Sequence, residues 1–168
     1  MGLARAWAVT LHGVAGHVVE IEADVGGGLP GLHLVGLPDA VLNESRDRVR
    51  AAVVNSGRSW PGERILLALS PATIRKTGAG FDLGLACAVL AAKEVVPQAA
   101  LDSTLLIGEL ALDGRLRSVA GVLPCLLAAR RAGLRRVVVP AAALAEAALV
   151  EGVEVHGAAT LNEVLLWL

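Results

Sequence analysis

The segment of residues 82–94 restricts the fold more than any other part of the chain, because it is apolar on almost every side of a helix. A helix without a polar face has to be enclosed by other elements. The whole chain has 168 residues, of which 55% are hydrophobic and 18% are charged, so it holds enough apolar material to enclose that helix. The sequence therefore predicts a single domain, residues 1–168, with this helix at its centre.

Alternating apolar and polar positions predict β-strands at residues 5–12 and 17–25. The glycine-bearing connector between them predicts a hairpin. A second hairpin is expected around Asp113-Gly114, which separates apolar runs at residues 105–112 and 115–119. Four further short apolar runs predict strands at residues 32–35, 65–69, 135–139 and 153–156.

Capping residues mark the expected helices. Asp39 is placed to begin a long helix that runs to about Ser56 and ends at Gly57. Asp82 is expected to cap the central helix and Thr160 the last one, with further helices at residues 121–132 and 141–149. Strands and helices in this order predict an α/β fold with mixed strand directions.

Several classes of protein are excluded by what the chain lacks. No apolar run reaches the roughly 20 residues of a membrane span, so we expect a cytoplasmic protein with no membrane partner. Cys87 and Cys125 lie in apolar runs and are expected to be reduced core thiols. The four histidines are scattered, and neither a bound metal nor another cofactor is expected.

The glycine-rich stretches do not predict nucleotide binding by this chain. A phosphate-binding loop needs Gly-Lys-Ser/Thr ahead of a helix, whereas residues 26–31 lead into a predicted strand. The stretch Gly78 to Gly84 leads into the central helix, but Asp82 would repel an anion there. We expect instead that these glycines let the loop approach the sheet closely.

Few residues suggest catalysis. No serine lies in a Gly-x-Ser-x-Gly motif, and Lys76 and Lys93 are the only lysines that could serve as a base. The three tryptophans are expected to fill hydrophobic seams.

Two arginine-rich segments are the remaining candidates for an interaction surface. A solvated face is the simpler interpretation, and a docking surface for a partner domain or a nucleic-acid strand is the alternative. A net charge of −1 argues against a general attraction to DNA. The candidate residues are Arg46, Arg48, Arg50, Arg130, Arg131, Arg135 and Arg136.

Several ordered motifs carry a resemblance that extends over essentially the whole chain. Residues 31–40 read Gly-Leu-His-Leu-Val-Gly-Leu-Pro-Asp-Ala, and residues 76–83 read Lys-Thr-Gly-Ala-Gly-Phe-Asp-Leu. Together with residues 44–52, 55–57, 60–61 and 70–72, they closely resemble the N-terminal domain of the ComM/YifB family of magnesium-chelatase-like AAA+ ATPases. The loop that carries the family motif includes Lys76, Gly78, Gly80, Phe81 and Asp82.

The resemblance implies a fold like the Lon protease domain, in the ribosomal-protein second-domain-like superfamily that includes GHMP kinases. It also implies that ATP and magnesium bind in an ATPase domain downstream of this one. Family members of the ComM branch are hexameric helicases for DNA branch migration in natural transformation. The implied partners are thus the ATPase domain, further copies of the chain, and branched or single-stranded DNA.

The same resemblance locates a degenerate catalytic dyad. In Lon-type proteases a serine stands where Gly80-Phe81-Asp82-Leu83-Gly84 has Asp82, and the general-base lysine corresponds to Leu123. Neither residue can perform the missing role. Gly108-Glu109 and Asp113-Gly114 resemble the hairpin between the dyad residues, and Ala68 stands where an asparagine is common.

These observations favour a non-catalytic accessory or regulatory domain that helps an ATPase ring to assemble or to engage DNA. One alternative is a peptidase or ligand-binding enzyme with a non-standard site. Another is a purely structural domain.

Overall fold

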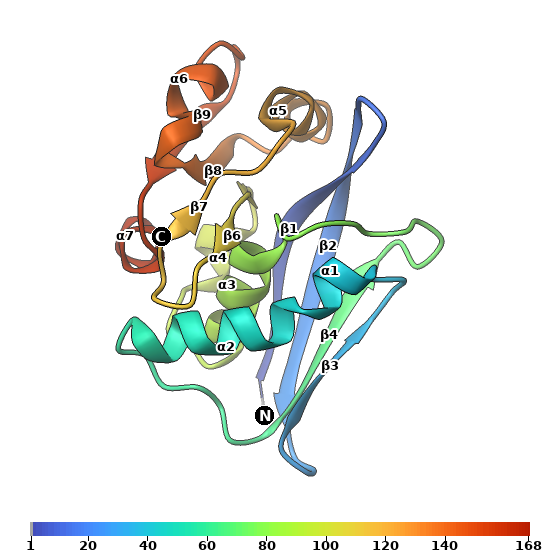
Figure 1. Ribbon diagram of the computed structural model, residues 1–168, viewed down its shortest axis with the longest axis vertical. Coiled ribbons are helices and arrows are strands. Elements are labelled where there is room, and N and C mark those ends of the chain that lie inside the picture. The colour runs from blue at the N-terminus through green and yellow to red at the C-terminus, as the bar shows by residue number, and fades with distance from the viewer. Residues whose placement is uncertain (1) are drawn as a thin grey trace.

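A computed structural model describes residues 2–168 and contains one seven-stranded sheet with helices on both faces (Figure 1). The strand order is β3-β4-β2-β1-β5-β8-β9, and a two-stranded ribbon, β6-β7, lies apart from it. The strands are β1 (Gly2–His12), β2 (Ala15–Gly26), β3 (Gly31–Val35), β4 (Arg64–Ser70), β5 (Thr104–Leu106), β6 (Glu109–Leu110), β7 (Leu116–Arg117), β8 (Arg136–Pro140) and β9 (Glu154–Ala158). The helices are α1 (Ala40–Asn43), α2 (Ser45–Asn55), α3 (Asp82–Ala92), α4 (Gln98–Leu101), α5 (Val122–Arg131), a 3₁₀ turn (Ala141–Ala143), α6 (Leu144–Ala147) and α7 (Leu161–Trp167).

Strand directions in the sheet are mixed, as the sequence predicts. The hairpin β1-β2 is antiparallel, and β2 also pairs antiparallel with β4. The other pairs, β3-β4, β1-β5, β5-β8 and β8-β9, are parallel. The prediction of a mixed α/β sheet is therefore confirmed.

Alternation along the strands determines which face of the sheet each helix covers. Ala4, Ala6 and Ala8 of β1 are buried against α3, because small side chains let this helix approach the sheet closely. Every residue of α3 is buried, with α2 packed on its outer side, so the prediction of a central helix is confirmed. On the opposite face, Trp7 and Val9 pack in a second cluster with α5.

The long helix predicted from Asp39 to Ser56 is wrong in one respect, since it is broken at Glu44 into α1 and α2. Arginine side chains bind the carbonyl groups that the break releases from the helix. Arg46 Nε donates to the Asn43 carbonyl at 3.2 Å, and Arg48 Nη2 donates to the Val41 carbonyl at 3.1 Å. The break is stabilised by hydrogen bonds from arginine side chains to backbone carbonyls, which apolar periodicity does not reveal.

The apolar run at residues 105–112 also differs from its prediction as one strand of a hairpin. Its first part, β5, belongs to the main sheet, and the chain leaves the sheet at Gly108 before β6 pairs with β7. The turn at Asp113-Gly114 is present, with the Ala111 amide donating to the Arg115 carbonyl. The helix predicted over residues 141–149 consists of a 3₁₀ turn followed by the short helix α6.

The helix caps predicted at Asp39 and Thr160 are confirmed. Asp39 caps α1 by accepting a hydrogen bond from the Leu42 amide at 2.7 Å, and Thr160 caps α7 in the same way through the Glu163 amide. The two cysteines are free and buried, and burial raises the pKa of each thiol to about 12. Within residues 2–168, no helix is long and apolar enough to cross a membrane.

Candidate functional site

Asp82 lies at the first residue of α3 and is completely buried. Its Oδ1 accepts hydrogen bonds from Ser45 Oγ at 2.5 Å and from Arg48 Nη2 at 3.2 Å. Its Oδ2 accepts from Arg48 Nε at 2.8 Å and from the Leu110 amide at 3.0 Å. A carboxylate has about four acceptor positions, so this side chain is fully occupied by its protein partners.

The expectation that Asp82 caps its own helix is wrong. The residue preceding α3 is Phe81, and no side chain caps the helix. The carboxylate is instead bound by α2 and by the first residues of the β6-β7 ribbon, because the two-pronged guanidinium of Arg48 binds both oxygens at once. Asp82 thus joins three segments that are distant in the sequence.

Ser45 and Arg48 are the residues of this site that the sequence did not identify as its members. Ser45 is not among the candidate residues of the sequence, and Arg48 was expected only as part of an arginine surface. In the structure the Arg48 side chain is only 17% exposed and its Nη2 also donates to Ser45 Oγ at 2.9 Å. The pKa of Arg48 lies above its ordinary value, chiefly because its side chain hydrogen-bonds Asp82. The only signal in the sequence for Ser45 and Arg48 was a polar residue among the apolar positions of a helix, three positions before an arginine.

Leu123, which the resemblance to Lon-type proteases places at the general-base lysine, lies in the first turn of α5 and packs in the second apolar cluster. Asp82 takes its polar partners from α2 and β6 instead. The hairpin scaffold around Gly108 is attached to the start of α3, since the Leu83 amide donates to the Gly108 carbonyl at 3.1 Å. The segment from Gly108 to Leu110 therefore lies directly beside Asp82.

The family-motif loop is bound to the turn that follows β3. The Lys76 amide donates to the Leu37 carbonyl at 3.0 Å, the Asp39 amide donates to the Lys76 carbonyl at 2.9 Å, and the Gly78 amide donates to the Asp39 carboxylate. The close approach to the sheet comes from Gly84, where a Cβ would lie 2.9 Å from Ile21 Cδ1. A Cβ at Gly80 would meet only an ordinary contact. The glycine that approaches the sheet closely is therefore Gly84, in the first turn of α3, and not Gly80 in the loop.

Lys76 is buried, and its ammonium donates to the Pro71 carbonyl. Within residues 2–168, no carboxylate lies within 4.0 Å of this ammonium. Burial lowers the pKa of Lys76 below its ordinary value of 10.5. A charge that lies away from water with one neutral partner lowers the stability of the fold.

We expect Lys76→Met to raise the free energy of unfolding at pH 7 by about 1–2 kcal/mol, because an unbranched apolar chain replaces a desolvated ammonium. The exposed Pro71 residue can exchange its lost partner for water. Between the lowered pKa and 10.5 the unfolded chain binds more protons than the folded one, so wild-type stability rises with pH there. The advantage of the variant should therefore shrink near pH 10.5, as measured by urea denaturation.

Lys93→Met is the matched control, because Lys93 is exposed and pairs with Glu63 at 2.9 Å. It should give no gain at either pH. A Lys76→Met variant that is less stable than the wild type at pH 7 would show that the ammonium contributes net stability.

The predicted arginine surface divides into separate patches. Arg46 and Arg50 are exposed on α2, while Arg130, Arg131 and Arg135 lie at or just after the end of α5, which covers the other face of the sheet (Figure 1). Arg136 stacks over the Trp167 ring, 4.0 Å from its centroid. Among residues 2–168, no group of three or more His, Cys, Asp or Glu side chains could hold a metal ion.

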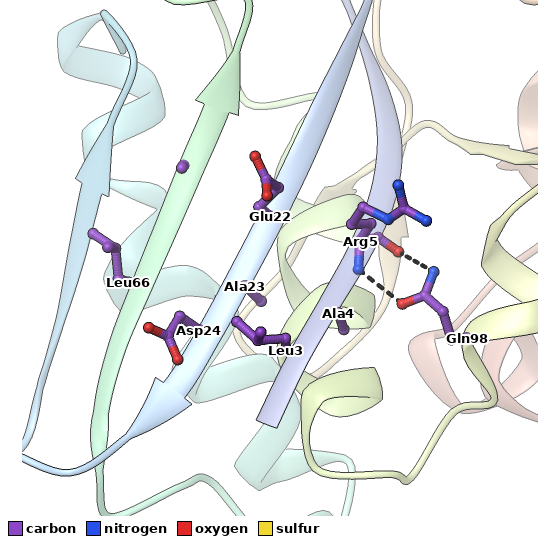
Figure 2. Close-up of a pocket in the computed structure, with 9 residues that line it drawn as sticks. Leu3, Ala4, Arg5, Glu22, Ala23, Asp24, Leu66 and Gln98 are labelled. Carbon is purple, nitrogen blue, oxygen red and sulfur yellow. Dashed lines mark hydrogen bonds between the residues drawn. The ribbon is translucent and has the colours of Figure 1, made fainter. Parts of the chain in front are cut away.

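A hollow with a mostly apolar floor lies on the sheet itself (Figure 2). It has a volume of about 490 Å³ and is bordered by the exposed sides of β1, β2 and β4 and by Gln98 of α4. Gln98 is fixed at its margin by hydrogen bonds with the backbone of Arg5. Ala68, which the resemblance places where an asparagine is expected, lines this hollow and stands opposite Glu22. The small side chain of Ala68 leaves the floor of the hollow open and places no polar group there.

The chain is similar in sequence to several known proteins. A family profile described as subunit ChlI of Mg-chelatase matches residues 21–143. A protein of Mycobacterium tuberculosis is 58% identical over all of this chain, YifB of Salmonella typhimurium is 43% identical over 82% of it, and the competence protein ComM of Haemophilus influenzae is 38% identical over all of it. The chain covers 33%, 27% and 33% of these three relatives, so it spans about a third of their length or less.

A more distant similarity connects the chain with proteases. The Lon protease of Salinispora arenicola is 34% identical over 83% of the chain, which covers 18% of that enzyme. The chain belongs to the Mg-chelatase ChlI family and matches the N-terminal domain of its ComM/YifB branch.

Proposed function

We propose that this chain is a non-catalytic accessory domain of a ComM/YifB-type AAA+ ATPase, and that it supports assembly of the ATPase ring and its engagement of DNA or a partner. The observation that carries this proposal is the state of Asp82. At the position that the resemblance assigns to a Lon-type serine stands a buried carboxylate whose two oxygens accept four hydrogen bonds.

The chemistry of this position supports a structural role. A nucleophile must be reachable by substrate and must be activated by a neighbouring base. Asp82 is enclosed, its oxygens are bound to Ser45, Arg48 and the Leu110 amide, and Leu123 cannot accept a proton. The protease-like scaffold would thus keep its shape while Asp82 holds α2 and the β6-β7 ribbon onto α3.

The proposed fold assignment is the Lon protease domain, in the ribosomal-protein second-domain-like superfamily. Its support is the mixed sheet together with the Lon protease similarity. We also propose that the parent protein acts as a hexameric helicase in DNA branch migration during natural transformation, in line with its competence-protein relative.

ATP and magnesium would bind in the part of the relatives that this chain does not cover. The residues of this chain do not fit them, because residues 27–30 lead into the strand β3 rather than into a helix, and Gly-Lys-Ser/Thr does not occur in the sequence.

The relative from Mycobacterium tuberculosis offers a direct test, since it contains a segment 58% identical to all of this chain. Removal of that segment should lower the fraction of ATP-dependent oligomer several-fold in mass photometry and should weaken binding to a fluorescent branched DNA. A truncated protein that forms rings and unwinds DNA as well as the full-length protein would contradict the proposal and favour a purely structural domain.

A second test addresses catalysis by the 168-residue chain itself. Incubation with fluorescent casein should release no peptides, and the same result is expected for Asp82→Asn. Casein turnover by the wild type that Asp82→Asn abolishes would contradict the proposal and favour a peptidase with a non-standard site.

A further inference from the structure

One half of the sheet has a bare face. Side chains at alternate positions of β1, β2 and β4 point to the side opposite α2 and α3, which cover the other face (Figure 1). The helix α5 covers this bare side only towards the β1-β2 turn, where Trp7, Val9 and Leu11 pack with it. The uncovered remainder contains the hollow of Figure 2.

The uncovered face combines apolar side chains with unpaired carboxylates. Leu3 is 75% exposed and borders the hollow together with Leu66. Glu22 and Asp24 lie on β2 between them and point to the same side (Figure 2). Neither carboxylate has a basic group within 4.0 Å in residues 2–168, because the guanidinium of Arg5 lies 3.9 Å from Glu20 instead.

The outer side of α2 has the complementary composition. Arg46 and Arg50 are exposed, four residues apart, and Val54 continues the same stripe with half of its surface exposed. A cleft of about 460 Å³ lies beside the two arginines and is also lined by Asp47 and Trp60. In the described part of the chain, neither arginine has a carboxylate within 4.0 Å.

The charges on the two surfaces are spaced alike. Glu22 and Asp24 are two residues apart on a strand, which corresponds to about 6.6 Å. Arg46 and Arg50 are four residues apart on a helix, which corresponds to about 6 Å along its axis. A helix laid along β2 could therefore place one arginine at each carboxylate, with Val54 near the exposed apolar side chains.

The two surfaces lie on opposite sides of the same chain, so a single copy cannot join them. A two-fold dimer would need both surfaces to face the partner at once, which opposite sides exclude. We propose that α2 of one copy, through Arg46 and Arg50, docks on the Glu22-Asp24 face of the next copy in a head-to-tail contact. Such contacts close into rings when the rotation between copies permits it. The inference rests on the ring-assembly role proposed above and identifies its interface.

Charge reversal on each surface tests the contact in the 168-residue chain. Neighbours in a ring experience an effective concentration on the order of millimolar, so sedimentation is measured up to about 1 mM chain. The wild type should associate, and added salt should weaken the association. The double variants Glu22→Lys/Asp24→Lys and Arg46→Glu/Arg50→Glu should each lower the association constant by about tenfold or more, since like charges then face each other.

A rescue experiment separates this contact from other effects of the substitutions. A mixture of the two double variants should associate again, because each altered surface then meets a complementary one. The variant with all four substitutions should also associate by itself. Glu146→Lys/Glu151→Lys and Arg131→Glu/Arg135→Glu change the same charges at exposed positions elsewhere and should associate like the wild type. Thermal melting confirms that each variant is folded.

A wild type that stays monomeric at about 1 mM would overturn the inference, as would reversed variants that associate normally or a mixture without rescue. Loss of DNA binding in Arg46→Glu/Arg50→Glu with unchanged self-association would assign α2 to nucleic acid instead and would also overturn the inference.

The accessory role proposed above is tested by a separate result. If removal of the domain from the Mycobacterium tuberculosis relative lowers ring formation while the charge variants do not, only the interface is wrong.

Discussion

Asp82→Ala should destabilise the chain by about 3–5 kcal/mol, because it leaves the guanidinium of Arg48 with no partner for its Nε and leaves the buried Leu110 amide unsatisfied. For a domain of this size the melting temperature should fall by about 6–20 °C. Urea denaturation measures the change in stability and a thermal scan the change in melting temperature, both followed by circular dichroism. The contacts with α2 and the β6-β7 ribbon should loosen first, since Asp82 joins both to α3.

Asp113→Ala is the matched control, because Asp113 forms an equally short ion pair with Arg115, at 2.8 Å, on the surface. Exposed pairs contribute little, so the change should be much smaller. The combined variant Asp82→Ala/Arg48→Ala should cost less than the sum of the two single changes, since neither charge is then left without its partner. A small loss of stability in Asp82→Ala would remove the structural explanation for this carboxylate and weaken the proposed function.

Gly36→Ala should cost about 3 kcal/mol or more, through two effects that act together. Gly36 has a φ of 107°, which side chains rarely adopt, and a Cβ there would lie 2.1 Å from the Leu69 carbonyl oxygen. The backbone of β4 would have to move, and Leu37 and Asp39, which bind the Lys76 loop, would move with it. Chemical denaturation measures the loss, and faster amide exchange at Lys76 would show that the loop has loosened.

Two other glycines serve as controls that separate the strain of a positive φ from the clash of an added Cβ. Gly57 has a φ of 81° but no atom within 4 Å of a Cβ, so Gly57→Ala should show only the backbone strain, about 1 kcal/mol. Gly62 has neither restriction, and Gly62→Ala should be close to neutral. Equal losses in Gly36→Ala and Gly57→Ala would show that β4 can yield to the added methyl group.

Much of the fold could be predicted because its signals are local. The Asp39 and Thr160 caps, the β1-β2 hairpin and the apolar helix α3 depend on residues a few positions apart. The break at Glu44 could not be predicted in this way. Its released carbonyls are bound by Arg46 and Arg48, and the second of these arginines is positioned by Asp82 from another helix.

The residues of the candidate site were also predictable only in part. Resemblance to a protease motif located Asp82, but it suggested nothing about Ser45, and it left Arg48 among the surface arginines. The ion pair between Arg48 and Asp82 spans 34 positions in the sequence. Only the packing of α2 on α3 brings these groups together, so no pattern along the chain could reveal the pair.

By itself, the sequence determined the mixed α/β class, the central position of residues 82–94 and the family, because these follow from apolar periodicity and ordered motifs. The tertiary structure decided that Asp82 holds helices together rather than capping one, that Lys76 is a buried cation, and that one half of the sheet is bare opposite α2. The physical reason is common to all three. Burial and the pairing of charges depend on which surfaces meet, and those surfaces come from segments that are far apart in the chain.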